Sequence, residues 1–173
     1  MGKLNHRIEP ENPGITLGPI EEKDREEILD ILTSPAVALT YMVPQFSARE
    51  DAIPLFSRLA ELSRDENRFV RGIFLGSKCV GFLNDVEIEN STIELGYAVH
   101  PSFWGMGCAT AGLKLAIDAL FDRGFRQVVC GAFEENTASL RCMEKVGMTL
   151  LEKTDEIEYR GKIHRCIYRH IAR

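Results

Sequence analysis

Residues 92–110 read TIELGYAVHPSFWGMGCAT, and this stretch decides the fold. Its first part, Thr92 to Val99, has the composition of a β-strand. A helix is expected from Thr110 to Arg123, because apolar residues recur there at helical spacing and Gly124 is suited to cap its end. Gly105 and Gly107 therefore lie in a loop that joins a strand to a helix.

This glycine loop, residues 104–110, has the chemistry of an anion-binding site. Glycine lets the backbone turn tightly and approach a ligand closely. The first N–H groups of the helix have no partner within it, and the helix dipole adds partial positive charge. Such a loop binds phosphate or pyrophosphate, and Thr110 would add a hydroxyl donor. A glycine turn without a ligand is the alternative, since short glycine patterns have many false positives.

The same glycines also suggest the dinucleotide fingerprint GxGxxG, with Glu134 as the acid that would bind the ribose. Two features argue against it. The sixth position would be Thr110, which is neither Gly nor Ala, and residues 100–104 separate the strand from the glycines, where the Rossmann turn is tight. A nucleotide-dependent oxidoreductase is therefore disfavoured.

Further elements follow on both sides of this unit. Pro35 is expected to end a first helix that starts at Glu21, and Ser47 and Glu50 form a capping box for a second. Pro54 lies well inside that second helix, so it requires a kink or a start near residue 51. Strands are expected at residues 15–17, 69–75, 79–86 and 127–133 and in two runs flanking Arg160-Gly161, with a short helix at 136–146.

This order of elements predicts an α/β fold of the α+β type, in a single domain that spans residues 1–173. Hydrophobic residues make up 45% of the chain and charged residues 27%, which excludes collagen-like and disordered classes. Apolar runs are too short to cross a bilayer, so no membrane partner is expected.

The charge balance bears on partners and location. The 21 basic residues are scattered among 26 acidic ones, whereas nucleic-acid backbones need clustered Lys and Arg, so no nucleic acid is expected. The net charge of −5 would mildly attract a cationic substrate. The five cysteines form no CxxC pair, and Met1–Pro10 lacks the apolar core of a signal peptide. Free thiols in a cytoplasmic, reducing compartment are therefore expected.

Two groups of potential ligands or nucleophiles have simpler interpretations. His164, Cys166 and His170 lie at even spacing in the last expected strand, but His164 and His170 would be roughly 20 Å apart there, too far to share one metal ion. No metal is therefore expected. Cys108 lies at a helix N-terminus, where thiol pKa falls, yet no His base is placed beside it, so a small loop residue is the expectation.

Residues 92–151 resemble the acetyl-CoA-binding core of the GNAT superfamily of N-acetyltransferases. The resemblance rests on Ile93-Glu94-Leu95-Gly96-Tyr97, on the glycine loop, and on Asn136-Thr137-Ala138-Ser139 running on to Gly147, in the order that the family has them. Trp104 stands first in the superfamily's Q/R-x-x-G-x-G/A loop, as in the RimJ/RimL branch, named for enzymes that acetylate N-termini of ribosomal proteins.

The resemblance implies the GNAT acyl-CoA N-acyltransferase fold, a mixed, mostly antiparallel sheet flanked by helices, whose central strands Glu94–Val99 and Gln127–Phe133 splay apart. The pantetheine arm of the co-substrate acetyl-CoA would lie in that opening against backbone groups of Ala98 and Val99, with the Val99 N–H directed at the thioester oxygen. The resemblance places the thiol end against Asn136 and Ser139. The pyrophosphate would rest on the backbone of Gly105, Met106, Gly107, Cys108, Ala109 and Thr110.

The implied reaction is direct attack of a primary amine on the acetyl thioester, with both substrates bound together. Glu94 is the first candidate for the general base, and Asp85 and Glu87 are the alternatives. The acceptor would be a protein N-terminus or a small-molecule amine. Tyr41 is expected either to border the acceptor pocket or to pack in the core.

One departure from the family concerns the general acid. Many members carry a tyrosine seven residues after the equivalent of Asn136, but Met143 stands there and cannot donate a proton. Ser139, water or Cys142 would take its place. The departure leaves a second hypothesis open, a non-catalytic acyl-CoA-binding or regulatory module. A homodimer is compatible with the sequence, which does not reveal the oligomeric state.

Overall fold

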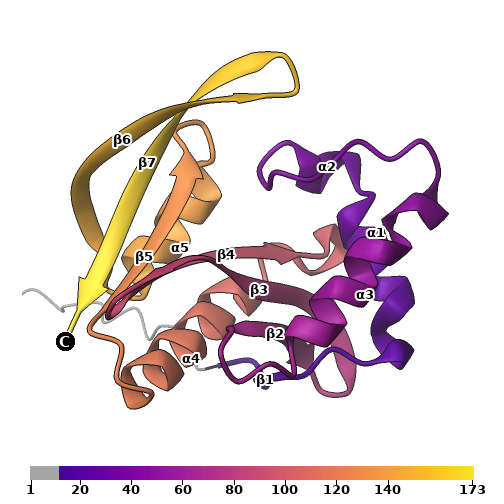
Figure 1. Ribbon diagram of the computed structural model, residues 1–173, viewed down its shortest axis with the longest axis horizontal. Coiled ribbons are helices and arrows are strands. Elements are labelled where there is room, and N and C mark those ends of the chain that lie inside the picture. Colours follow the sequence, from indigo (N-terminus) through magenta and orange to yellow (C-terminus); the bar gives the residue numbers. More distant parts are fainter. Residues whose placement is uncertain (1–11) are drawn as a thin grey trace, which may run out of the picture.

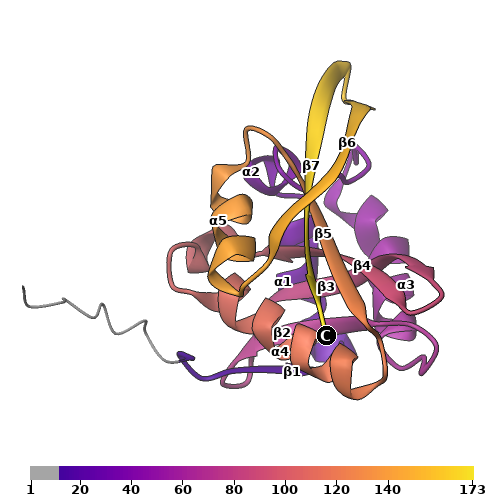
Figure 2. The same cartoon turned by 90° about the vertical axis from the view of Figure 1, so that its left-hand side faces the viewer.

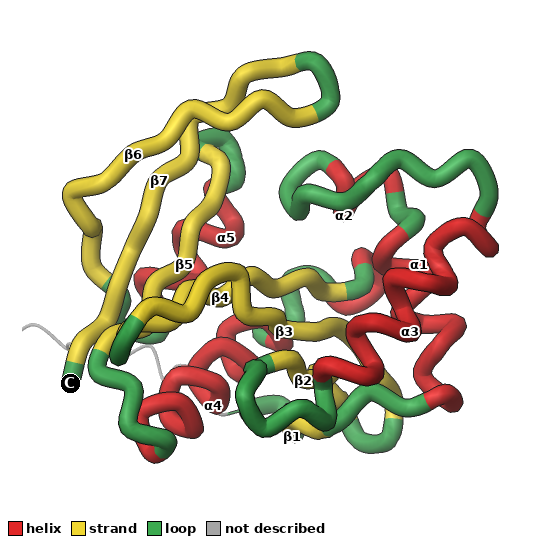
Figure 3. The backbone as a smooth tube through the Cα atoms, in the orientation of Figure 1, coloured by secondary structure: helices red, strands yellow, loops and turns green. Residues whose placement is uncertain are grey.

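The computed structural model describes residues 12–173, so the expectation about a signal peptide, which rests on Met1–Pro10, lies outside the described residues. In the described part, seven strands form one sheet in the order β1-β2-β3-β4-β5-β7-β6 (Figures 1 and 3). The strands are β1 (Ile15–Gly18), β2 (Val70–Leu75), β3 (Lys78–Glu89), β4 (Thr92–Val99), β5 (Gln127–Phe133), β6 (Thr149–Tyr159) and β7 (Lys162–Ala172). The α-helices are α1 (Arg25–Leu32), α2 (Pro35–Ala38), α3 (Ile53–Leu62), α4 (Cys108–Asp122) and α5 (Thr137–Lys145), with short 3-10 turns at η1 (Glu22–Asp24), η2 (Arg49–Ala52) and η3 (Pro101–Phe103).

The sheet is mostly antiparallel. Neighbouring strands pair antiparallel throughout, except for β4 and β5, which run parallel. A hairpin cannot join parallel neighbours, and α4 serves as the crossover between them. In the turn between β6 and β7, Arg160 and Gly161 have φ of 52° and 77°, the paired positive values of a tight hairpin turn. The mixed, mostly antiparallel sheet flanked by helices is therefore confirmed.

The parallel ladder between β4 and β5 is short. It runs from Thr92 opposite Gln127 to Leu95 opposite Cys130 and ends there, although both strands continue. Beyond this point β4 stays paired with β3, and β5 stays paired with β7. The two central strands thus splay apart as expected, and a wedge opens in the middle of the sheet (Figure 1).

Helices cover both faces of the sheet (Figure 2). Leu95 of β4 packs with Leu120 of α4 in the larger core cluster, whereas Ala98 belongs to a second cluster with side chains of α1, α2 and α3. Successive strand residues point to opposite faces. Tyr97 therefore lies on the α4 face, and Glu94 on the face of α1–α3.

The start of α3 differs from the expectation. The helix begins at Ile53, after η2, which places Pro54 in its first turn, where the missing N–H costs no hydrogen bond. The capping box predicted at Ser47 is wrong. One residue later along the chain, the carboxylate of Asp51 accepts the N–H of Ala48 at 3.0 Å, and this contact begins the 3-10 turn.

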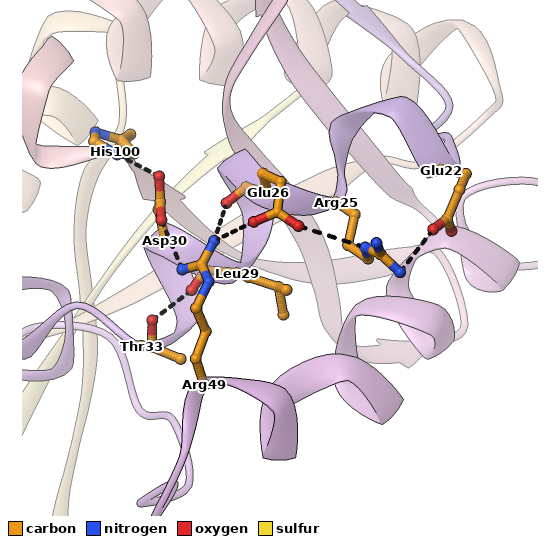
Figure 4. Close-up of polar contacts among 8 residues, drawn as sticks. All are labelled: Glu22, Arg25, Glu26, Leu29, Asp30, Thr33, Arg49 and His100. Carbon is orange, nitrogen blue, oxygen red and sulfur yellow. Dashed lines mark hydrogen bonds and ion pairs between the residues drawn. The ribbon is translucent and has the colours of Figure 1, made fainter.

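A chain of ion pairs ties α1 to its neighbours (Figure 4). Arg49 contacts Glu26 at 2.9 Å and Asp30 at 2.6 Å. Asp30 also lies 3.5 Å from Nε2 of His100, whose Nδ1 accepts the N–H of Ser102 at 3.1 Å. Exposed pairs of this kind contribute little to stability individually. Their consequence is positional, because they hold the segment between β4 and the glycine loop.

The five cysteines are buried with free thiols. Within residues 12–173, none of the helices has both the length and the apolar character that a membrane crossing requires.

Candidate active site

A cavity of about 520 Å³ lies where β4 and β5 diverge. Met106 does not line it and is half exposed, and Glu94 lies outside the lining as well. The other predicted site residues, from three separate segments of the sequence, meet at this cavity: Ala98, Val99, Gly105, Gly107, Cys108, Ala109, Thr110, Asn136 and Ser139.

The glycine loop contributes mainly backbone to the cavity. Gly105 and Gly107 have φ of 76° and 78°, which residues with a side chain rarely adopt. No atom lies within 4 Å of the position that a Cβ would take at either glycine, so the requirement is for conformation rather than for space. Gly107 is the N-cap of α4, and the helix therefore starts at Cys108, two residues earlier than predicted.

The N-terminus of α4 is open to an anion. The N–H groups of Cys108, Ala109 and Thr110 have no acceptor within the helix. The N–H of Ala111 makes the first helical contact, to the Gly107 carbonyl at 3.0 Å. The first turn carries no acidic side chain, so the partial positive charge of this helix of 15 residues is not neutralised there.

Two basic side chains add to this charge. Arg141 and Lys145, one turn apart on α5, line the cavity, and its described lining contains no acidic residue. The sequence reasoning missed both. Their spacing of four residues on a helix that follows an anion-binding loop was the available signal.

Trp104 holds the loop against the end of β4. Its indole N–H donates to the carbonyl of Val99 at 2.7 Å. That contact occupies the Val99 carbonyl, and Trp104 also lines the cavity. Phe103 also lines the cavity.

The backbone of β4 faces the wedge at alternate residues. The N–H of His100 donates to the carbonyl of Val80 at 2.7 Å, so the even-numbered residues direct their backbone groups to β3. Tyr97 and Val99 consequently present theirs to the wedge, whereas Ala98 lies opposite Phe82 of β3. This alternation favours Tyr97 and Val99 for backbone contacts with a cofactor, because Ala98 directs its backbone groups to β3.

Polar side chains gather at one end of the cavity. Asn136 caps α5, since its Oδ1 accepts the N–H of Ser139 at 3.2 Å. The hydroxyl groups of Ser139 and Tyr97 lie 2.7 Å apart, and Thr110 donates to the Cys142 sulfur at 3.5 Å. Burial raises the pKa of Tyr97 well above 10 and also raises the pKa of the Cys142 thiol. The sequence reasoning gave Tyr97 no role, because nothing local links it to α5.

The far side of the cavity is lined by α2 and by Gly96 of β4. Tyr41, which follows α2, also lines it, and its hydroxyl donates to Oδ1 of Asn84 at 2.8 Å. The Tyr41 ring meets that of Phe82 edge-on, with centroids 5.5 Å apart. Burial raises the pKa of Tyr41, so its phenol stays protonated. Tyr41 therefore packs against the core, as one of the two expectations had it, and it also borders the cavity.

The tip of the β6–β7 hairpin is tied to the loop that carries Tyr41 (Figure 1). The Tyr159 hydroxyl donates to the carbonyl of Ala38 at 2.8 Å and accepts the N–H of Val43 at 3.3 Å. Arg160 donates to the Val43 carbonyl, also at 3.3 Å. These contacts join segments more than 100 residues apart and fix one rim of the cavity.

Asp85, an alternative candidate base, is committed to a structural contact. Its carboxylate accepts two N–H groups of Arg68, at 2.6 Å and 2.8 Å, and the backbone N–H of Phe69 at 2.8 Å. Its side chain is only 2% exposed. A carboxylate held in this way has no position free for the proton of a substrate, so the structure argues against Asp85 as the base.

Glu94 is half-buried, and burial raises the pKa of its carboxyl, with Lys153 opposing the rise and Glu87 and Asp155 adding to it. Glu87 lies directly opposite Glu94 on β3 and is exposed. Glu94 lies one residue before the end of the parallel ladder, at the apex of the wedge.

Met143, His164 and His170 do not line the cavity. Met143 is fully buried in the core. His164 stacks on Phe133 and pairs with the carboxylate of Glu135, while His170 contacts the amide of Gln127. Among the residues that the structure describes, no three potential ligands gather into a group that could hold a metal ion.

The comparisons with known proteins agree with this architecture. The chain superposes on RimL, a ribosomal L7/L12 alpha-N-protein acetyltransferase in complex with coenzyme A, with a TM-score of 0.81, 20% identity, and coverage of 94% of this chain and 96% of that one. Spermidine N-acetyltransferase from Vibrio cholerae in complex with CoA and spermine superposes with a TM-score of 0.78 at 16% identity, and the match covers 93% of this chain and 96% of that one. The microcin C7 self-immunity acetyltransferase MccE with acetyl-CoA and AMP superposes with a TM-score of 0.79 at 20% identity, and the match covers 93% of each chain.

These likenesses establish the fold, and RimL represents the branch that the sequence resembles. A family model described as an acetyltransferase (GNAT) domain matches residues 15–149, most of the chain, including the glycine loop and α5. The chain therefore belongs to the GNAT acetyltransferase family.

Proposed function

We propose that this protein transfers the acetyl group of acetyl-CoA to a primary amine, by direct attack while both substrates are bound. The observation that carries the proposal is the course of the cavity. It extends from the open N-terminus of α4, past the wedge between β4 and β5, to Tyr41 and Gly96 on the far side. A cofactor and an acceptor can therefore reach one point from two sides.

The cofactor half of the cavity suits a diphosphate with a peptide-like arm. The free N–H groups from Cys108 to Thr110 would bind the pyrophosphate, and Arg141 and Lys145 lie where further phosphate charge would be neutralised. The backbone of Tyr97 and Val99 would pair with the pantetheine arm as an added strand. A backbone N–H aimed at the thioester oxygen contributes about 10²–10³ in rate in a water-poor site.

The acceptor must be a neutral amine when it attacks. At pH 7 the loss of its proton costs about 1.4 kcal/mol for an α-amine of pKa about 8 and about 4.6 kcal/mol for a lysine of pKa about 10.4. Glu94, half-buried at the apex of the wedge, would receive that proton through water. Its raised pKa brings the carboxylate closer to the working pH, which favours a general base.

The acceptor class follows from the same arithmetic and from the neighbours. An α-amine is the easier substrate to deprotonate, and RimL is described as an alpha-N-protein acetyltransferase. The carboxylates of Glu87 and Asp155 act on Glu94 near the apex of the wedge, outside the cavity lining, and the three together would attract a cationic amine. One structural neighbour is a spermidine N-acetyltransferase. A protein N-terminus and a small polyamine are therefore the two classes to test.

The test is an acceptor screen that follows release of the CoA thiol. Peptides with free and with blocked N-termini, polyamines and amino sugars are supplied at equal concentration with acetyl-CoA. Thiol release that depends on one class of amine supports the proposal. Tight binding of acetyl-CoA with no release for any amine would instead support the non-catalytic module that the buried Met143 leaves open.

A further inference from the structure

Tyr97 and Ser139 form a hydroxyl pair inside the cavity. Tyr97 comes from β4 and Ser139 from the first turn of α5, and both line the cavity. Their hydroxyl oxygens lie 2.7 Å apart, and the phenol oxygen is also 3.3 Å from the carbonyl oxygen of Ser139. The pair is thus a contact between two elements of the sheet and helix layers, 42 residues apart in the sequence.

Each member of the pair is held in place. The backbone of Ser139 is fixed by the Asn136 cap, which accepts its N–H. The ring of Tyr97 packs against the larger core cluster, on the α4 face of the sheet. Cys142, whose sulfur accepts from Thr110, lies in the same end of the cavity. A rigid phenol therefore meets a rigid serine at the place where the acyl end of the cofactor would lie.

Either hydroxyl could donate in the 2.7 Å contact, and acidity favours one direction. A phenol, with a pKa of about 10, is far more acidic than an alcohol and is therefore the stronger donor. Its other acceptor, the carbonyl of Ser139, is farther away at 3.3 Å. When the phenol donates to Oγ, the proton of Ser139 cannot point back along the same line. The serine hydroxyl then has its donor free for the cavity.

We propose that Tyr97 is a positioning residue, whose phenol donates to Ser139 Oγ and so directs the serine O–H at the sulfur of CoA. This inference rests on the proposed function, and it assigns the stabilisation of the leaving group to a serine that a tyrosine orients. The pair takes over the task that Met143 cannot perform, with Ser139 at the start of α5 and Tyr97 on β4.

The chemical step balances as follows. The amine nitrogen forms a bond to the thioester carbon, the resulting intermediate collapses, and the C–S bond breaks with its electron pair remaining on sulfur. The Ser139 O–H donates a hydrogen bond to the thiolate and keeps its own proton, because a thiol has a pKa of about 8.5, far below that of an alcohol. The proton lost by the amine passes to the general base and to solvent.

The first test needs no acceptor and measures the thiol pKa of bound CoA. CoA carrying a free thiol is bound to the wild-type protein, to Tyr97→Phe and to Ser139→Ala, and the pH of each complex is then varied. Ultraviolet absorbance of the thiolate is the readout. The expected thiol pKa is lowest on the wild type, by about one unit, since a hydrogen bond that favours the thiolate tenfold shifts the pKa by that amount. The same pKa on all three proteins overturns the inference.

The second test is a double-mutant cycle on kcat. Ser139→Ala is expected to lower kcat about 10- to 100-fold, the usual range for a charge-assisted hydrogen bond, and Tyr97→Phe about tenfold. The double variant should be no slower than Ser139→Ala, because Tyr97 acts through the serine. Tyr168→Phe, whose phenol contacts Asp155 and does not line the cavity, serves as the matched control and should combine additively with Ser139→Ala. Additive losses for Tyr97→Phe and Ser139→Ala would refute the positioning role.

The two failures are distinguishable. If CoA does not bind to the wild-type protein, as measured by calorimetry, the proposed function itself is wrong. If CoA binds and amines release its thiol, but the bound thiol pKa is the same on all three proteins and the cycle is additive, only the role of Tyr97 is wrong.

Discussion

Exchange of Gly107 for asparagine and for aspartate separates the two roles of the glycine loop. Both side chains have nearly the same size, and both tolerate positive φ better than other residues with a Cβ. At Gly107 φ is 78°, and apart from the two neighbouring residues no atom lies within 4 Å of an added Cβ, so the Cβ itself meets no clash. The two variants therefore share the backbone strain and differ in one negative charge.

The backbone strain is the smaller of the two effects, and both variants share it. A residue with a Cβ in the left-handed region costs roughly 1–2 kcal/mol, and Asn and Asp lie at the low end of that range. For a domain of this size, 1 kcal/mol lowers Tm by about 2–4 °C. Without ligand, Gly107→Asp should lose less stability than Gly107→Asn, by about 0.3–1 kcal/mol, because its carboxylate lies at the N-terminus of α4, where the helix dipole favours a negative charge. Thermal unfolding without ligand measures both losses.

In the complex with the cofactor, the same charge opposes binding. A carboxylate about 6 Å from one phosphate charge repels it by about 0.7 kcal/mol at the dielectric constant of water and by about 2.8 kcal/mol at an effective value of 20. The Kd for acetyl-CoA should therefore be about 3- to 100-fold higher for Gly107→Asp than for Gly107→Asn. Isothermal titration calorimetry at low salt measures the ratio, which should shrink as added salt shortens the Debye length.

A result in which both variants bind acetyl-CoA within twofold of each other at low salt would refute the assignment of the pyrophosphate to this loop.

Three further outcomes follow from the structure. Glu94→Gln should lower kcat about 10²- to 10⁴-fold at neutral pH. A general base must be deprotonated, and burial raises the pKa of Glu94, so the wild-type rate should fall towards acid at a pH above the ordinary glutamate pKa. This acid limb should vanish from the pH–rate profile of the variant. Arg68→Met should lower the free energy of unfolding by about 3 kcal/mol in a denaturant titration, since it leaves the buried carboxylate of Asp85 without its cation; a loss below 1 kcal/mol would contradict this. Tyr159→Phe removes the contacts with the loop after α2 and should cost about 1–2 kcal/mol, with faster amide hydrogen exchange at Val43, whereas unchanged exchange there would show that the hairpin does not hold the loop.

The central unit of the fold could be predicted because its signals are local. A β-prone run, two glycines and a helical repeat lie within some 30 consecutive residues, and each needs only its own neighbours in the chain. The hairpins at residues 76–78 and at Arg160-Gly161 were predictable for the same reason. The start of α4 was placed two residues late, because Gly107 serves as the N-cap through its backbone and leaves no side-chain signal.

Contacts between distant segments could not be predicted in this way. Asp85 and Glu87 are two residues apart and would share a face in a regular strand, but the register shifts between them, so Asp85 lies opposite Leu95 and Glu87 opposite Glu94. This bulge gives the two carboxylates different partners, and the sequence alone shows no sign of it. The contact between Tyr97 and Ser139 likewise depends on how α5 is placed against β4.

Peptide groups, rather than particular side chains, form much of the surface where the nucleotide would lie, and every residue except proline carries an N–H. Substitutions along the loop can therefore accumulate for long evolutionary times without removing a single donor, provided that the chain keeps its path at Gly105 and Gly107. The two CoA-bound neighbours share only 16% and 20% of their residues with this chain, and a surface made of peptide groups does not require their side chains to agree with its own.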